Sequence, residues 1–258
     1  SEERAESLRE ELGINKPVIV RYVNWLTDFV KGDFGISYKY KMPVSRLISD
    51  KIPVTMYLAV ITLIVIVIIS IPLGVFMARF GHRKVSKIFD IVNQSVMAVP
   101  SFFLGIMITI IFGLVLKWFT PGKYVSYRDD FNGFIMYLIP AAFAVAIPKI
   151  AMMVKFLKNS LIREMDSDYV RTAYSKGAGE NRVLFCHVLR NGLMPAITLL
   201  GMIIAEIMAG SIVVEQVFNL PGLSAILVSS VSTRDYPVVQ AIVVYIAFVV
   251  IITNLSLI

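Results

Sequence analysis

The side chains that most often perform catalysis are few and dispersed in this sequence. It has one cysteine, Cys186, which excludes an internal disulfide, and two histidines, too few for a histidine-rich metal site. It has no Gly-x-x-x-x-Gly-Lys-[Ser/Thr] phosphate loop, so the chain is not itself an ATPase of that type. Ser224 is a lone serine that we expect on the opposite side of the molecule from His82 and His187. We therefore expect no enzymatic activity, and no metal or cofactor in this chain.

Two carboxylates interrupt an apolar run over residues 193–216. An ionisable side chain inside a membrane is costly and marks a transport path by default. Glu206 lies roughly 20 Å along a helix that starts at Leu193, where it would suit an amine terminus or a cationic chelate. Two alternatives remain open, a basic partner on another subunit or a protonated carboxyl. Glu215 lies near the end of the run and predicts a structural hydrogen bond or ion pair.

Other polar side chains in the apolar runs are candidates for lining the same path. With Glu206, the predicted set contains Ser211, Asn93 and Gln94. Asn93 and Gln94 could instead form hydrogen bonds between helices, which is the interpretation we favour for them. Lys149 and Lys155 are expected to extend their ammonium groups towards the inner membrane face.

A further pattern lies between Asp166 and Pro195, a segment too long for a simple connection. Its first part predicts a short helix that ends at Gly177, because glycine adopts the left-handed conformation after a helix without penalty. Tyr169, Ala173 and Gly177 share one stripe of this helix, and a second helix begins near residue 180. A short amphipathic helix that cannot bury itself within its own chain requires a protein partner.

Long apolar helices must hold these residues in place. The 258 residues are 57% apolar and 17% charged, and the mean hydropathy of +0.75 excludes an ordinary water-soluble enzyme. Residues 52–78 alone are free of charge, enough for a helix of roughly 40 Å across a hydrocarbon core of ~30 Å. We predict five spans, at about 52–78, 91–116, 131–154, 193–216 and 236–258.

The net charge of +7 is distributed unevenly among the connecting segments. Basic residues gather in 79–90 and 155–192 and are sparse in 117–130 and 217–235. The positive-inside rule then places the two basic segments in the cytoplasm and residues 1–51 outside. Because the chain starts outside at Ser1 and ends within an apolar run, we expect five spans of a six-span protein.

The outer segment, residues 1–51, is more polar than the rest of the chain. We expect a short charged helix over 1–12 and a second helix from Pro17 to Gly32, with an apolar stripe that includes Tyr22 and Trp25. This stripe is expected to pack on the outer surface of the protein, and contact with lipid headgroups is the alternative.

Specific motifs in this sequence resemble a known family. The stretch DYVRTAYSKG at 168–177, followed by HVLRNGLMP at 187–195, closely resembles the coupling loop of ABC importer permeases, in the oligopeptide/dipeptide (nickel) branch. Other stretches that fit the same branch are GDFG at 32–35, VPSF at 99–102, GS at 210–211, VE at 214–215, VFNLPGL at 217–223 and RDYP at 234–237. The resemblance covers essentially the whole chain from about residue 12.

The resemblance implies an all-α integral membrane protein with the ABC type I importer permease fold. Its permease domain would cover 52–258, with a cytoplasmic coupling-helix loop over 163–192 that docks on an ATPase subunit. The residues that match the docking helix of such permeases are Tyr169, Val170, Arg171, Thr172, Ala173, Lys176 and Gly177. Arg171 and Thr172 replace the Glu and first Ala of the general pattern, as is common in the peptide branch. Residues 187–190 depart from the Ile-x-Leu-Pro of the wider family, so the docking of the second helix stays open.

The implied function is that of a permease subunit in an ATP-driven, binding-protein-dependent importer of oligopeptides or dipeptides. The implied partners are a second, paralogous permease, two ABC ATPase subunits that bind ATP and Mg, and an extracytoplasmic substrate-binding protein. We expect a bacterial or archaeal cell membrane around the chain and no nucleic acid. The same scaffold could import nickel or another metal chelate. An alternative of another class is a secondary transporter that does not use ATP, which would need inverted repeats with broken helices.

Overall fold

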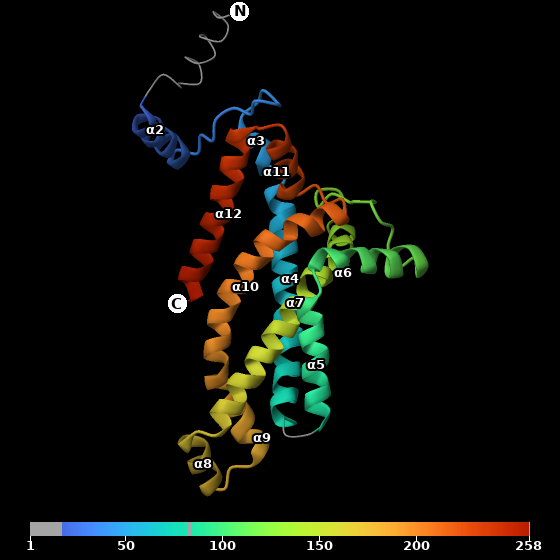
Figure 1. The fold of residues 1–258 in the computed structure, drawn as a ribbon, viewed down its shortest axis with the longest axis vertical. Coiled ribbons are helices and arrows are strands. Elements are labelled where there is room, and N and C mark those ends of the chain that lie inside the picture. Colours follow the sequence, from blue (N-terminus) through green and yellow to red (C-terminus); the bar gives the residue numbers. More distant parts are fainter. Residues whose placement is uncertain (1–16, 82–83, 258) are drawn as a thin grey trace, which may run out of the picture.

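Helices account for nearly all of the described structure (Figure 1). A computed structural model describes residues 17–81 and 84–257, and the helix expected over 1–12 lies outside them. Within these residues the only strand-like pairing is an isolated bridge between Ile36 and Pro43. Four helices are long and apolar enough to cross a membrane, or five if one bent pair is counted as a single span. The chain therefore has the all-α membrane architecture expected from its apolar runs.

The helices follow one another with short connections. In chain order they are α2 (Val18–Val30), α3 (Val44–Ser49), α4 (Ile52–Arg79), α5 (Lys84–Ala98), α6 (Ser101–Ile108), the π-helical η1 (Thr109–Val115), α7 (Phe131–Met165), α8 (Asp168–Ser175), α9 (Glu180–Val183), the π-helical η2 (Leu184–Val188), α10 (Leu189–Val217), α11 (Leu223–Ser232) and α12 (Tyr236–Leu257).

Helix α7 is the central helix of the bundle and packs against α4, α5, α6 and α10. Its buried face is rich in small side chains, among them Ala141, Ala142, Ala144 and Ala146. Small residues let helix backbones approach closely. Close packing of this kind drives helix association in lipid, where the hydrophobic effect does not draw helices together. The same principle applies at Gly74 of α4, where an added Cβ would lie only 2.8 Å from the Leu157 side chain. The α4–α7 pair thus forms the tightly packed centre of the molecule.

The run predicted as one span at 91–116 is bent by 94° in the structure, between α5 and the α6–η1 helix. The bend falls at Val99 and Pro100, where Pro100 adopts an extended conformation with φ −63° and ψ 140°. A proline has no N–H for the helical ladder and disfavours a helical conformation in the residue before it. In Figure 1, α6 accordingly turns away from the long axis of the bundle. A charge-free run predicts the length of a membrane segment but not the point at which the segment bends, so this bend was not predicted.

The two ends of the bundle differ (Figure 1). One end carries α8 and α9, and the other carries α3, α11 and the first turn of α12. At the latter end a separate apolar cluster joins these helices, with Val44, Ile48, Leu223, Ile226, Val238, Ala241 and Ile242 buried in it. The described residues of segment 79–90, namely 79–81 and 84–90, therefore share one end with segment 155–192, and segments 33–51 and 217–236 share the other.

Helix α2 begins directly after Pro17 and ends before Gly32, as the sequence predicts. None of its residues is buried, and only Trp25 and Phe29 are half-buried, so the expected packing of its apolar stripe on the protein surface is wrong for most of the stripe. The Trp25 ring contacts the rings of Tyr22 and Phe29, and Phe29 also contacts Phe34. This short aromatic row holds α2 to the turn that follows it and leaves the rest of its apolar stripe open.

Candidate functional site

Helix α8 extends from the end of the bundle as a short, sharply bounded element. It follows α7 after a turn and ends in two backbone hydrogen bonds, from Gly177 N to Tyr174 O at 2.9 Å and from Ala178 N to Ala173 O at 3.1 Å. These two bonds form a Schellman motif, which requires a left-handed residue at the position of Gly177. Its φ of +79° meets this requirement. The glycine therefore fixes where the helix stops and where the chain turns towards α9.

The two faces of α8 differ in exposure, which divides the residues predicted to couple to an ATPase. Val170 is only 2% exposed, and Ala173 is partly buried against the main core. The other predicted residues are exposed, namely Tyr169, Arg171, Thr172, Lys176 and Gly177. Val170 and Ala173 thus anchor the helix to its own chain, while the exposed side chains form the surface that α8 presents. We call these five exposed residues the α8 outer face.

Polar contacts also fix α8 relative to α7. The Tyr169 hydroxyl donates to the Glu164 carboxylate at 2.6 Å, and the Ser167 hydroxyl donates to the Glu164 carbonyl oxygen at 2.6 Å. Burial raises the pKa of Tyr169 above its usual value, with the Glu164 hydrogen bond acting in the same direction. The phenol therefore keeps its proton near neutral pH and remains a donor to Glu164. This contact ties the start of α8 to the last turn of α7.

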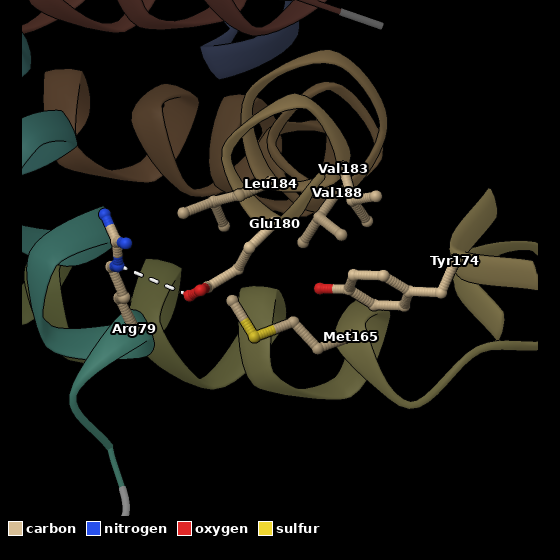
Figure 2. A pocket seen from close by; sticks show the side chains of 7 residues that line it. All are labelled: Arg79, Met165, Tyr174, Glu180, Val183, Leu184 and Val188. Carbon is tan, nitrogen blue, oxygen red and sulfur yellow. Dashed lines mark ion pairs between the residues drawn. The ribbon is translucent and has the colours of Figure 1, made fainter. Parts of the chain in front are cut away.

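A small hollow separates α8 from the ends of α4 and α7 (Figure 2). Arg79 and Glu180 form an ion pair across it at 3.3 Å, and the Tyr174 hydroxyl points into it. Met165, Val183, Leu184 and Val188 complete its lining. The hollow measures about 60 Å³, room for a few water molecules and not for a peptide. The hollow lies where the loop meets the bundle, because its lining side chains come from α4, α7, α8, α9 and η2.

Glu206 has a partner within its own chain. Its carboxylate accepts a hydrogen bond from the Lys149 ammonium group, so α10 and α7 are linked by an ion pair within their apolar stretches. The Lys149 side chain is 24% exposed and the Glu206 side chain 46%. Lys149 therefore does not extend to the membrane face as expected, and Glu206 is not an isolated charge.

The other predicted path residues fall into two groups. Asn93 is buried and donates to the Ala151 carbonyl oxygen at 2.7 Å, and Ser211 is buried and donates to the Met208 carbonyl oxygen at 3.1 Å. Gln94 is exposed and accepts from Lys155 Nζ at 2.5 Å. Asn93 and Gln94 thus both bond between α5 and α7. Of the predicted set, Glu206 and Gln94 are the side chains that the structure leaves accessible.

Glu215 is fully buried and joins three helices at the opposite end of the bundle. Its carboxylate accepts from Thr55 Oγ1 at 2.7 Å and from Ser224 N at 3.0 Å, and it also accepts from the Ser224 hydroxyl. Gly222 packs so closely that an added Cβ would lie 2.3 Å from a Glu215 oxygen. The expected structural hydrogen bond at Glu215 is confirmed. It links α4, α10 and α11.

Sequence reasoning missed a second buried carboxylate at this end, Asp235. It accepts from Ser37 Oγ at 2.5 Å, from Tyr38 N at 3.0 Å and from Lys39 N at 3.2 Å. The hairpin around residue 36 is thereby fixed to the turn between α11 and α12. The RDYP stretch at 234–237 was the one sequence signal for Asp235, but a motif does not show which residues its side chains contact. In the described parts of the chain no group of three or more His, Cys, Asp or Glu side chains could hold a metal ion.

Four or five apolar helices long enough to cross a membrane, packed into one bundle, define the class of multi-pass membrane proteins. Residues 70–258 match the family described as the inner membrane component of binding-protein-dependent transport systems. The chain belongs to this family. The resemblance drawn from the loop motifs is thus confirmed, and the family is a non-enzymatic component of a transport complex, as expected.

Three relatives extend this likeness over nearly the whole chain. The oligopeptide transport system permease protein AppB of Bacillus subtilis (strain 168) is 38% identical over 253 residues, covering 97% of this chain and 80% of that protein. A putative peptide transport system permease protein of Brucella suis biovar 1 (strain 1330) is 35% identical over 258 residues, covering 98% and 81%. The glutathione transport system permease protein GsiC of Escherichia coli O1:K1 / APEC is 33% identical over 251 residues, covering 97% and 79%.

Family membership implies the work this chain does and two of its partners. It is the membrane permease of an ABC importer, and the family name implies a substrate-binding protein and ATPase subunits. A transporter that works without ATP, the alternative of another class, does not fit this family.

Proposed function

We propose that this chain forms half of an ATP-driven path for peptides across the cell membrane, with the α8 outer face as its contact to an ATPase subunit. The observation that carries the proposal is the division of α8 into an anchored face, with Val170 2% exposed, and an exposed face. A docked helix that is rigidly held by its own bundle can transmit a movement of its partner. The names of the relatives, which refer to oligopeptide, peptide and glutathione transport, favour peptides as cargo.

Movement would pass from α8 into the bundle through identified contacts. Tyr169 transmits it to α7 through Glu164, and Glu180 transmits it to α4 through Arg79. Because α4 and α7 pack tightly along their lengths, both helices would tilt together. Closure of the ATPase subunits would open the path towards the binding protein, and hydrolysis would reset it.

The assembly would contain a second permease subunit, a paralogue of this chain, and two ATPase subunits that bind ATP and Mg. A half-exposed glutamate at 46% exposure within an apolar helix supports a second permease, because lipid is a costly environment for that group. The path would lie between the two permeases, with Glu206 and Gln94 among the side chains that reach it.

The orientation in the membrane follows from the distribution of basic residues. The end with α8 and α9 would face the cytoplasm, since 79–90 and 155–192 hold most of the basic loop residues. The end with α3 and α11, including the chain up to residue 51, would then face the binding protein outside.

The cargo class can be tested by uptake into vesicles. The complex of both permeases and both ATPases is reconstituted, and uptake of a labelled tripeptide is measured with binding protein and ATP present. We expect unlabelled peptides to compete and a nickel–histidine chelate not to compete. If the chelate competes and peptides do not, the scaffold serves a metal chelate and the peptide assignment is wrong.

A further inference from the structure

The ion pair of Lys149 and Glu206 differs from the other charged contacts inside the bundle. Lys158 is almost fully buried and lies 2.7 Å from both carboxylate oxygens of Asp90, which ties α5 to α7. Lys155 meets the neutral Gln94. Only the Lys149–Glu206 contact, among the ion pairs of the described residues, joins α7 to α10. These are the two helices connected by the α8 loop.

The exposure of this pair makes lipid a costly neighbour for it. Side chains that are 24% and 46% exposed would leave polar atoms unsatisfied in hydrocarbon. The face of α7 and α10 that carries them is therefore turned towards the second permease subunit and the path that the two subunits would enclose. Since Lys149 and Glu206 carry opposite charges in contact, their fields largely cancel at the distance of a passing solute. Glu206 alone would attract cations, and with Lys149 beside it this preference is removed.

We propose that Lys149 and Glu206 together make the path neutral at this point, and so allow peptides of different side-chain charge to pass at similar rates. The proposal rests on the proposed function, because it assigns Lys149 and Glu206 a charge-balancing role on the same path. Lys149 is then a specificity-determining residue as much as Glu206. The expectation that Glu206 by itself favours amine termini or cationic chelates is replaced by balance between the two side chains.

The test compares uptake of cationic, anionic and neutral tripeptides by the reconstituted four-subunit complex with one binding protein throughout. The readout is the ratio of charged to neutral peptide uptake relative to wild type, so that the selectivity of the binding protein cancels. We expect Lys149→Gln to raise the cationic ratio and Glu206→Gln to raise the anionic ratio, each by roughly three- to tenfold. The double variant should return both ratios to the wild-type values.

A matched control removes one positive charge elsewhere. Arg128 forms an ion pair with Asp50 at 2.7 Å at the end of the bundle that carries α3, with both side chains more than half exposed. Arg128→Gln changes the net charge as Lys149→Gln does, and it should leave the peptide ratios unchanged. Ratios that do not move in the single variants, or move equally in Arg128→Gln, would overturn the proposal while peptide uptake by the wild type still supports the proposed function. If wild type takes up no peptide, both proposals fail.

A second design covers single variants that do not assemble. On a Cys186→Ser background, Lys149→Gln is combined with Glu206→Cys, so that the complex assembles without either charge. A sulfonate or an ammonium thiol reagent is then attached to the assembled complex. We expect the sulfonate to favour cationic peptides and the ammonium group to favour anionic ones, relative to the Cys186→Ser complex treated alike. A position that the reagents cannot reach, or ratios that both reagents leave unchanged, would show that the pair does not face the path.

Discussion

Two glycines in the loop between α8 and α9 differ in what a side chain would cost. Gly177 has a φ of +79°, which L residues rarely adopt, whereas Gly179 has a φ of −70°. Neither has another atom within 4 Å of an added Cβ. The difference between them is therefore conformational and not steric.

Replacement of these glycines should have unequal effects on coupling. A non-glycine residue in the left-handed region costs about 1–2 kcal/mol, which lowers the population of the native turn by up to roughly thirtyfold. We expect Gly177→Val to reduce peptide-stimulated ATP hydrolysis by the assembled complex several-fold, and Gly179→Ala to leave it near wild type. Equal hydrolysis by the two variants would contradict the role given to the α8 turn.

The Glu215 contacts predict a loss of stability that is independent of coupling. In Glu215→Gln an amide NH₂ would face the hydroxyl and N–H donors of Thr55 and Ser224, which leaves buried donors unsatisfied at a cost of about 1–3 kcal/mol. We expect a lower Tm for the purified complex in detergent, and also a lower Tm for Thr55→Val, which removes a donor to Glu215 and leaves the buried Leu223 N–H without its acceptor. A Tm that is unchanged in both variants would show that this cluster does not hold α4, α10 and α11 together.

At the scale of elements, the orientation of α8 predicts which positions an ATPase subunit can reach. On a Cys186→Ser background, a cysteine at Thr172 lies on the exposed face and one at Val170 lies against the core. We expect short bifunctional thiol reagents to join Thr172→Cys, but not Val170→Cys, to a cysteine in the groove of the ATPase. Efficient crosslinking from Val170→Cys would mean that α8 docks through the opposite face.

The elements were predictable to different degrees. The apolar run at 52–78 coincides with α4, and the run at 131–154 with the first part of α7, which continues to Met165. Both were predictable because a long run without charges leaves a membrane helix as the main possibility. The bend at Pro100 was visible in the sequence only as a proline within an apolar run, because hydropathy does not show where a helix axis changes direction. The end of α8 at Gly177 was predictable because it depends on local backbone chemistry.

The pairing of side chains was the part that sequence could not supply. Glu206 stands out as a charge in an apolar run, but Lys149 lies 57 residues away on another helix. Helical periodicity places residues on faces and does not show which faces meet. For the same reason Asp235 was missed, since its partners lie nearly 200 residues away in the hairpin around residue 36.

At the scale of the whole molecule, the single cysteine provides a probe of orientation. Cys186 is exposed near α9, at the end proposed to be cytoplasmic. We expect a membrane-impermeant maleimide to label it in inside-out vesicles and not in right-side-out ones. Ser126→Cys on a Cys186→Ser background, in the loop at the opposite end, should give the reverse pattern. Labelling of Cys186 from outside would reverse the proposed topology.

The central claim is that ATP acts at the α8 end while cargo arrives at the α3–α11 end. It is tested most directly by peptide uptake into proteoliposomes of the full complex, in which ATP and binding protein are each supplied on a chosen side. We expect ATP-dependent uptake only when ATP is on the side that carries α8 and the binding protein is on the other side. Uptake without ATP, or with ATP and binding protein acting from the same side, would contradict the account.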